Sequence, residues 1–289
     1  MTAGMRNDTP ARAPGRSARP GLTAAYRATI ALIVMQAVAS AAGLLVPGLY
    51  QDEVWAASTM RGGDLVTLAA GVPLLAVALV LAVRGSPRGQ LAWIGLLAYT
   101  VYNSAYYALG AAFNDIFLLH VALLVLSIVT LVLGLASLDV TGIAARFSPS
   151  TPARLIGTFL LLVAASMGGM WIWSSIGFAL TGEIATGAIP LAAVHLVYVL
   201  DLTLLVPGLA IGGVLLWRRS PWGWVAGTAM SVLGAVYLLN LFVSGVFQAR
   251  AGVPGVQPVA WNLLALGVAF AAAAVALLRG ARPDGGLRR

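Results

Sequence analysis

A carboxylate in the middle of an apolar segment is the residue of this sequence best placed to do chemistry. Asp201 lies about halfway along the apolar run 189–217, where a charged side chain costs roughly 2.5 to 3.5 kcal/mol on membrane-insertion scales. On a helix, His195, Tyr198 and Asp201 are three residues apart and form one slanted stripe. Such a stripe can relay a proton or bind a small cation. The alternative is that Asp201 only hydrogen-bonds a neighbouring helix.

Polar side chains occur at comparable depth in other apolar runs. Gln36 lies near the middle of one run, Tyr102 and Asn103 near the middle of another, and Asn240 within a third. If these helices converge, their side chains form a polar pocket near the membrane midplane, where transporter folds bind substrate. We therefore predict a substrate or proton site that contains Asp201, Tyr198, His195, Asn103, Tyr102, Asn240 and Gln36.

The two histidines suggest a second kind of chemistry. His120 and His195 each follow the outer start of their run, at Asp115 and Pro190, by five residues, so both are expected about 7.5 Å below that boundary. Equal depth would let them share a haem, or a divalent metal that an acidic side chain completes. Ordinary hydrogen-bonded histidines and no cofactor are the competing expectation.

Five further carboxylates are expected at the outer face or its edge. Most of them are interpreted as solvated loop charges, and the group comprises Asp52, Glu53, Asp64, Asp115 and Glu183.

Composition excludes several large classes of protein. Hydrophobic residues make up 60% of the chain and charged residues 9%, against roughly 25% charged in soluble domains. The chain has no cysteine and no lysine, which excludes disulfides, thiolate chemistry, Schiff-base lysines and the P-loop lysine. It also lacks the HExxH and GxSxG motifs, so an enzyme is the less favoured class. The net charge of +8 is spread over short loops, which argues against nucleic acid as a partner.

Apolar runs long enough to cross a membrane dominate the chain. A hydrocarbon core about 30 Å thick needs roughly 20 helical residues. Eight runs qualify: 26–46, 64–83, 91–113, 115–137, 155–180, 189–217, 222–247 and 259–278. The predicted fold class is an all-α membrane protein with eight transmembrane helices, surrounded by the lipid bilayer.

The arginines predict how these spans are oriented. If the N-terminus is cytoplasmic, fifteen of the seventeen arginines fall on the cytoplasmic side, and only Arg61 and Arg250 fall outside. Positively charged loops are retained on the cytoplasmic side. We therefore predict a multi-pass plasma-membrane protein with both termini cytoplasmic. Cleavage after Ala39 as a signal peptide is disfavoured, because the apolar run continues through Val46.

An internal repeat divides the chain into two halves. The pattern Val72-Pro73 with the turn Arg-x-Ser-Pro-x-Gly at 84–89 recurs 134 positions later as Val206-Pro207 and 218–223. Four spans per half mean that the halves face the same way, as a parallel repeat. The predicted organisation is a disordered cytoplasmic tail (1–25), a first four-helix unit (26–137), a cytoplasmic linker (138–154), a second four-helix unit (155–278) and a cytoplasmic tail (279–289). The two prolines are expected to kink their spans.

One segment carries a resemblance. Residues 101–119, which read VYNSAYYALGAAFNDIFLL, resemble a hairpin of uncharacterised multispan membrane proteins of bacteria. The resemblance covers only two spans; it implies plasma-membrane residence and supplies no activity or catalytic residues. Three functions stay open: a transport-like protein that handles a small solute or proton at Asp201, a redox or haem/metal protein that uses the histidines, and a non-catalytic assembly or sensory partner. Homo-oligomerisation is compatible with each.

Overall fold

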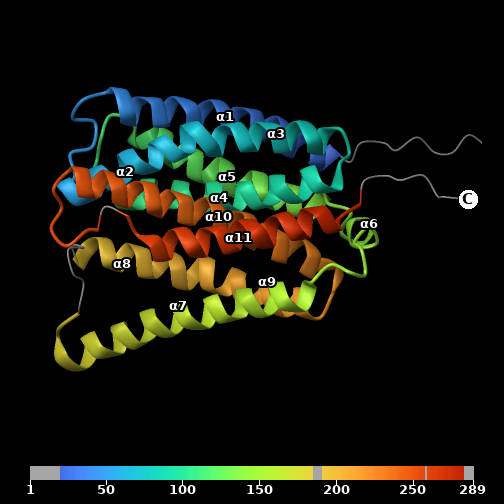
Figure 1. Ribbon diagram of the computed structural model, residues 1–289. Helices are drawn as coiled ribbons and strands as arrows, with labels where there is room; N and C mark the ends of the chain where they lie inside the picture. Colours follow the sequence, from blue (N-terminus) through green and yellow to red (C-terminus); the bar gives the residue numbers. More distant parts are fainter. Residues whose placement is uncertain (1–19, 185–190, 258, 283–289) are drawn as a thin grey trace, which may run out of the picture.

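The computed structural model describes residues 20–184, 191–257 and 259–282, which form long helices and no β-strand. Eight rods run lengthwise through the bundle (Figure 1). Their bounds are α1 Pro20–Leu45, α2 Val54–Val66 with α3 Val72–Val83, α4 Pro87–Gly110, α5 Phe117–Ser137, α7 Ala153–Thr181, α8 Leu191–Leu200 with α9 Val206–Trp217, α10 Pro221–Arg250 and α11 Trp261–Gly280. A short helix, α6 (Val140–Ala144), lies across one end. The predicted span boundary at Ile189 and most of both tails lie outside the described residues.

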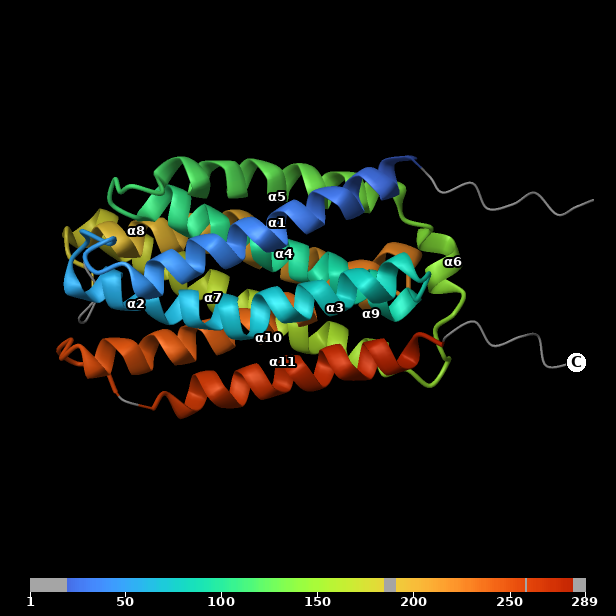
Figure 2. The ribbon, with the colours of Figure 1, turned by 90° about the horizontal axis from the view of Figure 1, so that it is seen from above.

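Seven of the described helices are long and apolar enough to cross a membrane, which makes this a multi-pass membrane protein by length and composition. The predicted span at 91–113 is the exception, although α4 has 24 residues. This helix lies among α3, α5 and α10 (Figure 2), and its polar side chains reach further helices: Trp93 donates to Thr29 of α1, and Tyr107 donates to the backbone oxygen of Met60 on α2. A rod enclosed by protein does not need an apolar surface. The count of eight spans therefore stays a prediction.

The first apolar rod after α1 begins well before its predicted start at Asp64. Val54–Val83 is one helix of 30 residues, about 45 Å long, so its first turns extend beyond a 30 Å hydrocarbon core. Arg61, Gly62 and Gly63, which precede the predicted span, are helical, and the two glycines allow close helix packing. A Cβ on Gly62 would lie 2.5 Å from Cα of Ser244 on α10. The interpretation of Asp64 as a solvated edge charge is wrong: its side chain is 2% exposed.

Each proline of the repeated pattern follows a wide helical turn. π-helical turns at Thr67–Gly71 and Asp201–Leu205 connect α2 to α3 and α8 to α9, directly before the Val-Pro pairs. Proline has no N–H and its ring collides with the carbonyl four residues earlier. The wider π turn gives that ring room. Both turns, and both helices that follow them, have the same bounds 134 positions apart.

The two Arg-x-Ser-Pro-x-Gly turns also fold alike. Ser86 Oγ accepts a hydrogen bond from Gly89 N at 3.2 Å, and Ser220 Oγ accepts one from Gly223 N at 3.1 Å. Each serine thus caps a helix whose first turn contains proline. A Cβ on Gly89 would lie 2.5 Å from Leu81 Cβ on the preceding helix. The motif is therefore a compact helix–helix turn.

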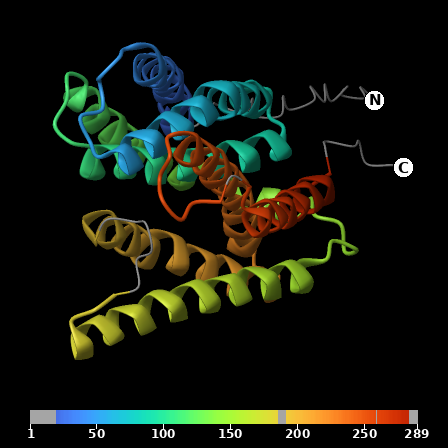
Figure 3. The same cartoon turned by 60° about the vertical axis from the view of Figure 1, so that its left-hand side comes forward.

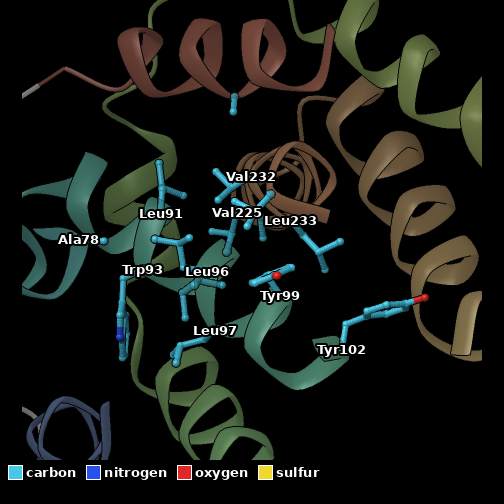
Figure 4. Packing of buried hydrophobic residues seen from close by; sticks show 14 of the residues in the cluster. Ala78, Leu91, Trp93, Leu96, Leu97, Tyr99, Tyr102, Val225, Val232 and Leu233 are labelled. Carbon is cyan, nitrogen blue, oxygen red and sulfur yellow. The ribbon is translucent and has the colours of Figure 1, made fainter. Parts of the chain in front are cut away.

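The packed centre lies between α4 and α10. Leu91, Leu96, Val225, Val232 and Leu233 meet there (Figure 4). Figure 3 shows α7 and the α8–α9 rod on one side of α10, with the helices of the first half on the other side. Because α4 and α10 contact both halves, side chains on these two helices can join residues that are distant in the sequence.

The arginine-bearing turns gather at one end of the bundle, together with α6 and both described ends of the chain (Figure 1). Arg88 Nε donates to the backbone oxygen of Ala281 at 2.7 Å. Arg219 donates to the backbone oxygens of Pro149 at 3.1 Å and Thr151 at 3.2 Å. These bonds join the start of α4 to the C-terminal end of α11, and the α9–α10 turn to the linker before α7.

Candidate functional site

Asp201 is the most buried carboxylate among the described residues, at 1% exposure. It is the first residue of the π turn between α8 and α9. Tyr102 of α4 donates its O–H to Asp201 Oδ1 at 2.6 Å, and Trp171 of α7 donates Nε1–H to Oδ2 at 2.9 Å. In Figure 4, Tyr102 points out of the apolar core toward the α8–α9 rod. The carboxylate therefore joins three helices, one donor to each oxygen.

A second tyrosine extends this cluster to α10. The Tyr237 ring meets the Tyr102 ring edge to face, with centroids 5.0 Å apart. Their hydroxyl oxygens are 3.5 Å apart, and Tyr102 can donate its single hydrogen to Tyr237 or to Asp201, one at a time. Tyr102 thus has two oxygen neighbours, the Asp201 carboxylate and the Tyr237 hydroxyl. The Tyr102 hydroxyl could relay a proton between these two neighbours, because a hydroxyl both donates and accepts hydrogen bonds.

A surface pocket of about 810 Å³ lies between α7 and the α8–α9 rod. His195 and Tyr198 of α8 and Phe178 of α7 line it. The Tyr198 ring lies 4.2 Å from the Trp171 ring, centroid to centroid. Along the predicted stripe, His195 is exposed, Tyr198 is half-buried and Asp201 is buried. The stripe therefore runs from the wall of the pocket into the protein.

Two other predicted site residues form a separate network. Asn240 of α10 donates to Tyr99 Oη at 2.8 Å and to Asn103 Oδ1 at 3.2 Å. Asn103 in turn donates to Thr67 Oγ1 of the first π turn at 3.5 Å. Although Asn103 directly follows Tyr102, successive helical residues point about 100° apart. The single pocket expected from shared depth is thus two neighbouring clusters.

Gln36 joins neither cluster by a hydrogen bond. Its side chain is 5% exposed, and its Nε2 has no hydrogen-bond partner among the described residues.

The two histidines lie in different surroundings. His120 of α5 is 3% exposed and stacks on Tyr107 of α4, with ring centroids 5.2 Å apart. Its Nε2 has no hydrogen-bond partner within the described part of the chain. His195 is exposed at the pocket. No group of three His, Cys, Asp or Glu side chains able to hold a metal occurs among the described residues, and a shared haem or metal stays an untested expectation.

A second buried carboxylate was missed by sequence reasoning. Asp64 Oδ2 accepts the hydroxyl of Tyr50 at 2.7 Å. Burial, and next the negative charge of Asp64, raise the pKa of Tyr50 above its ordinary value, so Tyr50 keeps the proton that it donates. The glycines at 62 and 63 were the available signal, because small residues mark close helix contacts. Because Asp64 directly follows these two glycines, it belongs to the part of the helix that packs closely against its neighbours.

Comparison with protein-family models, with curated proteins and with solved structures finds no match for this chain. The resemblance of residues 101–119 to bacterial multispan proteins therefore stays an expectation, and function is inferred from the buried carboxylates and their partners.

Proposed function

We propose that this multi-pass membrane protein is transport-like and binds and releases a proton, or a small solute, at Asp201. The observation that carries the proposal is a carboxylate of 1% exposure held by two uncharged donors, the Tyr102 hydroxyl and the Trp171 indole. A buried ion without a countercharge is costly. A bound proton or a cationic solute removes that cost, and release of the proton or solute restores the cost.

The hydrogen bonds around Asp201 suit proton exchange. In the ionised state, Tyr102 donates to Oδ1 across 2.6 Å. When Oδ1 takes up a proton, that proton can donate to the Tyr102 oxygen, and the Tyr102 hydrogen turns toward Tyr237, whose oxygen is 3.5 Å away. Trp171 keeps its bond to Oδ2 in both states, because an indole N–H only donates. The site thus accommodates both protonation states by rotation of one hydroxyl.

The surface pocket supports the same proposal. Trp171 contacts both Tyr198 on the pocket wall and Asp201 inside. On this path from the pocket to the carboxylate, the Tyr198 ring comes first and the Trp171 indole second. Movement of these two rings would open the way between the pocket and the carboxylate.

The architecture that we propose around this site is two parallel four-helix units, with eight spans and both termini on the cytoplasmic side of the plasma membrane. Supporting observations are the matched π turns, the matched serine-capped turns and the gathering of arginines at one end of the bundle.

Proton flux into liposomes tests the proposal. The purified protein is reconstituted with a pH-sensitive dye trapped inside, and a pH gradient is imposed. We expect flux with the wild type and with Glu183→Gln, which removes an exposed carboxylate, and none with Asp201→Asn. Equal flux in Asp201→Asn and wild type would contradict a proton site. Cationic solutes are then assayed for binding. Equal binding by the wild type and by Asp201→Asn would also contradict a solute site at Asp201.

The cofactor alternative has its own measurement. His120 has a buried ring nitrogen without a hydrogen-bond partner among the described residues, which is the observation in its favour. Purified protein that carries haem would absorb in the Soret region, and metal analysis would detect a divalent ion. A colourless, metal-free but active protein would exclude this alternative.

A further inference from the structure

We propose that Asp64 is a second proton-binding site, reached from the α1–α2 loop through Tyr50. This inference rests on the proposed function, because a second carboxylate serves a proton path only if protons cross the bundle. Asp64 belongs to the first half of the chain and Asp201 to the second. Both lie beside a π turn: Asp64 is three residues before Thr67, and Asp201 is the first residue of its own turn.

The surroundings of Asp64 resemble those of Asp201 in their chemistry. Its side chain is 2% exposed and accepts a hydrogen bond from an uncharged donor, Tyr50. α1 comes so close at Gly43 that a Cβ there would overlap Asp64 Oδ2. The positive charge that acts on Asp64 is Arg61, which is nearly one turn away on the same helix and exposed. The buried carboxylate therefore has no direct cationic partner among its hydrogen bonds.

The charged and titratable groups that face Asp64 come from four elements. They are Arg61 of α2 itself, Tyr50 and Asp52 of the α1–α2 loop, Tyr99 and Tyr107 of α4, and His120 of α5 behind Tyr107. Of these, Arg61 alone carries a permanent positive charge. A proton taken up by Asp64 thus removes a negative charge from a region rich in neutral hydroxyls.

The loop residues provide the route from the surface. Tyr50 is 6% exposed and lies in the same loop as Asp52, whose charge acts on the Tyr50 hydroxyl. Asp52 Oδ1 accepts the backbone N–H of Ala112 at 2.8 Å, whereas its buried Oδ2 has no hydrogen-bond partner among the described residues. An unpaired buried oxygen is costly, and a proton or a water molecule in transit would satisfy it.

Proton transfer at Tyr50 leaves that residue unchanged. A hydronium ion at the loop gives a proton to the Tyr50 oxygen while the Tyr50 hydroxyl hydrogen passes to Asp64 Oδ2, 2.7 Å away. Water is left at the loop, Tyr50 is again a neutral phenol, and Asp64 becomes a neutral acid. The reverse sequence returns the proton.

Polar side chains connect this site with the interior. A Cβ on Gly63 would lie 2.8 Å from Tyr107 Oη and 3.3 Å from the Asn240 amide. Asn240 bonds to Tyr99 and Asn103, and Asn103 directly follows Tyr102, the partner of Asp201. Hydroxyl and amide groups therefore lie beside Asp64 on α4 and α10, whereas no hydrogen bond among the described residues joins the Asn240 cluster to Tyr102 and Asp201.

The test compares Asp64→Asn, Asp201→Asn and the exposed-site control Asp115→Asn. Proton flux into liposomes is measured together with the infrared carboxylic-acid C=O band between acidic and alkaline samples. We expect Asp64→Asn to lower flux on the order of 100-fold and to remove one band component, with Asp201→Asn removing another. The Asp115→Asn protein should keep wild-type flux.

The outcomes separate the two proposals. Wild-type flux and an unchanged infrared band in Asp64→Asn, with no flux in Asp201→Asn, would overturn the Asp64 site and leave the proposed function standing. Wild-type flux in both variants would overturn both. If Asp64→Asn does not fold, Tyr50→Phe replaces it, because this change removes the relay hydroxyl and keeps the ring. Its control is Tyr26→Phe, whose hydroxyl bonds to Ala82 O instead; equal flux in these two variants would again overturn the Asp64 site.

Discussion

Two substitutions of Asp201 are expected to separate proton binding from helix–helix attachment. In Asp201→Asn, one carbonyl oxygen remains, so either Tyr102 or Trp171 loses its acceptor. An interhelical hydrogen bond in a membrane is worth about 0.6 to 2 kcal/mol, and we expect the free energy of unfolding to fall by about 1 kcal/mol. Asp201→Leu removes both acceptors and leaves two donors unpaired, which predicts a loss of about 2 to 4 kcal/mol.

Activity should follow a different order from stability. Neither asparagine nor leucine can bind a proton at this position, so both variants should lose proton flux although Asn costs little stability. The assay pairs thermal unfolding in detergent with flux in liposomes on the same preparations. The control is Thr203→Val in the same π turn, because the Thr203 hydroxyl bonds to Val199 O of its own helix. Full flux in folded Asp201→Asn, with a stability loss only in Asp201→Leu, would show that Asp201 merely attaches helices and would refute the reasoning.

Three further predictions concern packing, capping and topology. Gly43→Ala is expected to destabilise the protein by about 1 to 3 kcal/mol, because its Cβ would overlap the Asp64 carboxylate; Gly169→Ala, which meets nothing within 4 Å, should be neutral or stabilising in the same thermal unfolding assay. Ser220→Ala should cost about 0.5 to 2 kcal/mol through loss of the α10 cap, and unchanged stability would show that the cap contributes nothing there. Reporter fusions after Arg146 should score cytoplasmic and those after Gly182 external, and an external score at Arg146 would contradict the proposed 4+4 topology.

The two halves of the chain differ in the contact between their first two helices. In the first half, Asp64 of α2 bonds to Tyr50 beside α1. At the corresponding positions 134 residues later, the second half has Tyr198 and Ile184, and both line the pocket between α7 and α8. With no carboxylate–hydroxyl pair at these positions, the second half has an open groove where the first is closed.

Local regularities in the sequence predicted much of the fold. Apolar length alone identified the membrane-spanning class, since a helix must satisfy its own backbone hydrogen bonds in lipid. The Arg-x-Ser-Pro-x-Gly motif predicted its turns because capping and glycine contacts act within a few residues. The burial of Asp201 inside the bundle followed from its depth, since the cost of a charge that faces lipid depends on where along a span it lies.

Tertiary structure decided which polar groups meet. Depth along a helix does not determine how the helix is rotated or which neighbour it faces, so Tyr102 and Asn103 reach different clusters although they are adjacent. The burial of Asp64 could not be predicted for the same reason. The sequence places Asp64 at a charged, glycine-rich edge, but α1 and the α1–α2 loop cover it in the structure. Burial of a side chain is a property of the helices packed around it, and those contacts join residues as far apart as Tyr102 and Asp201.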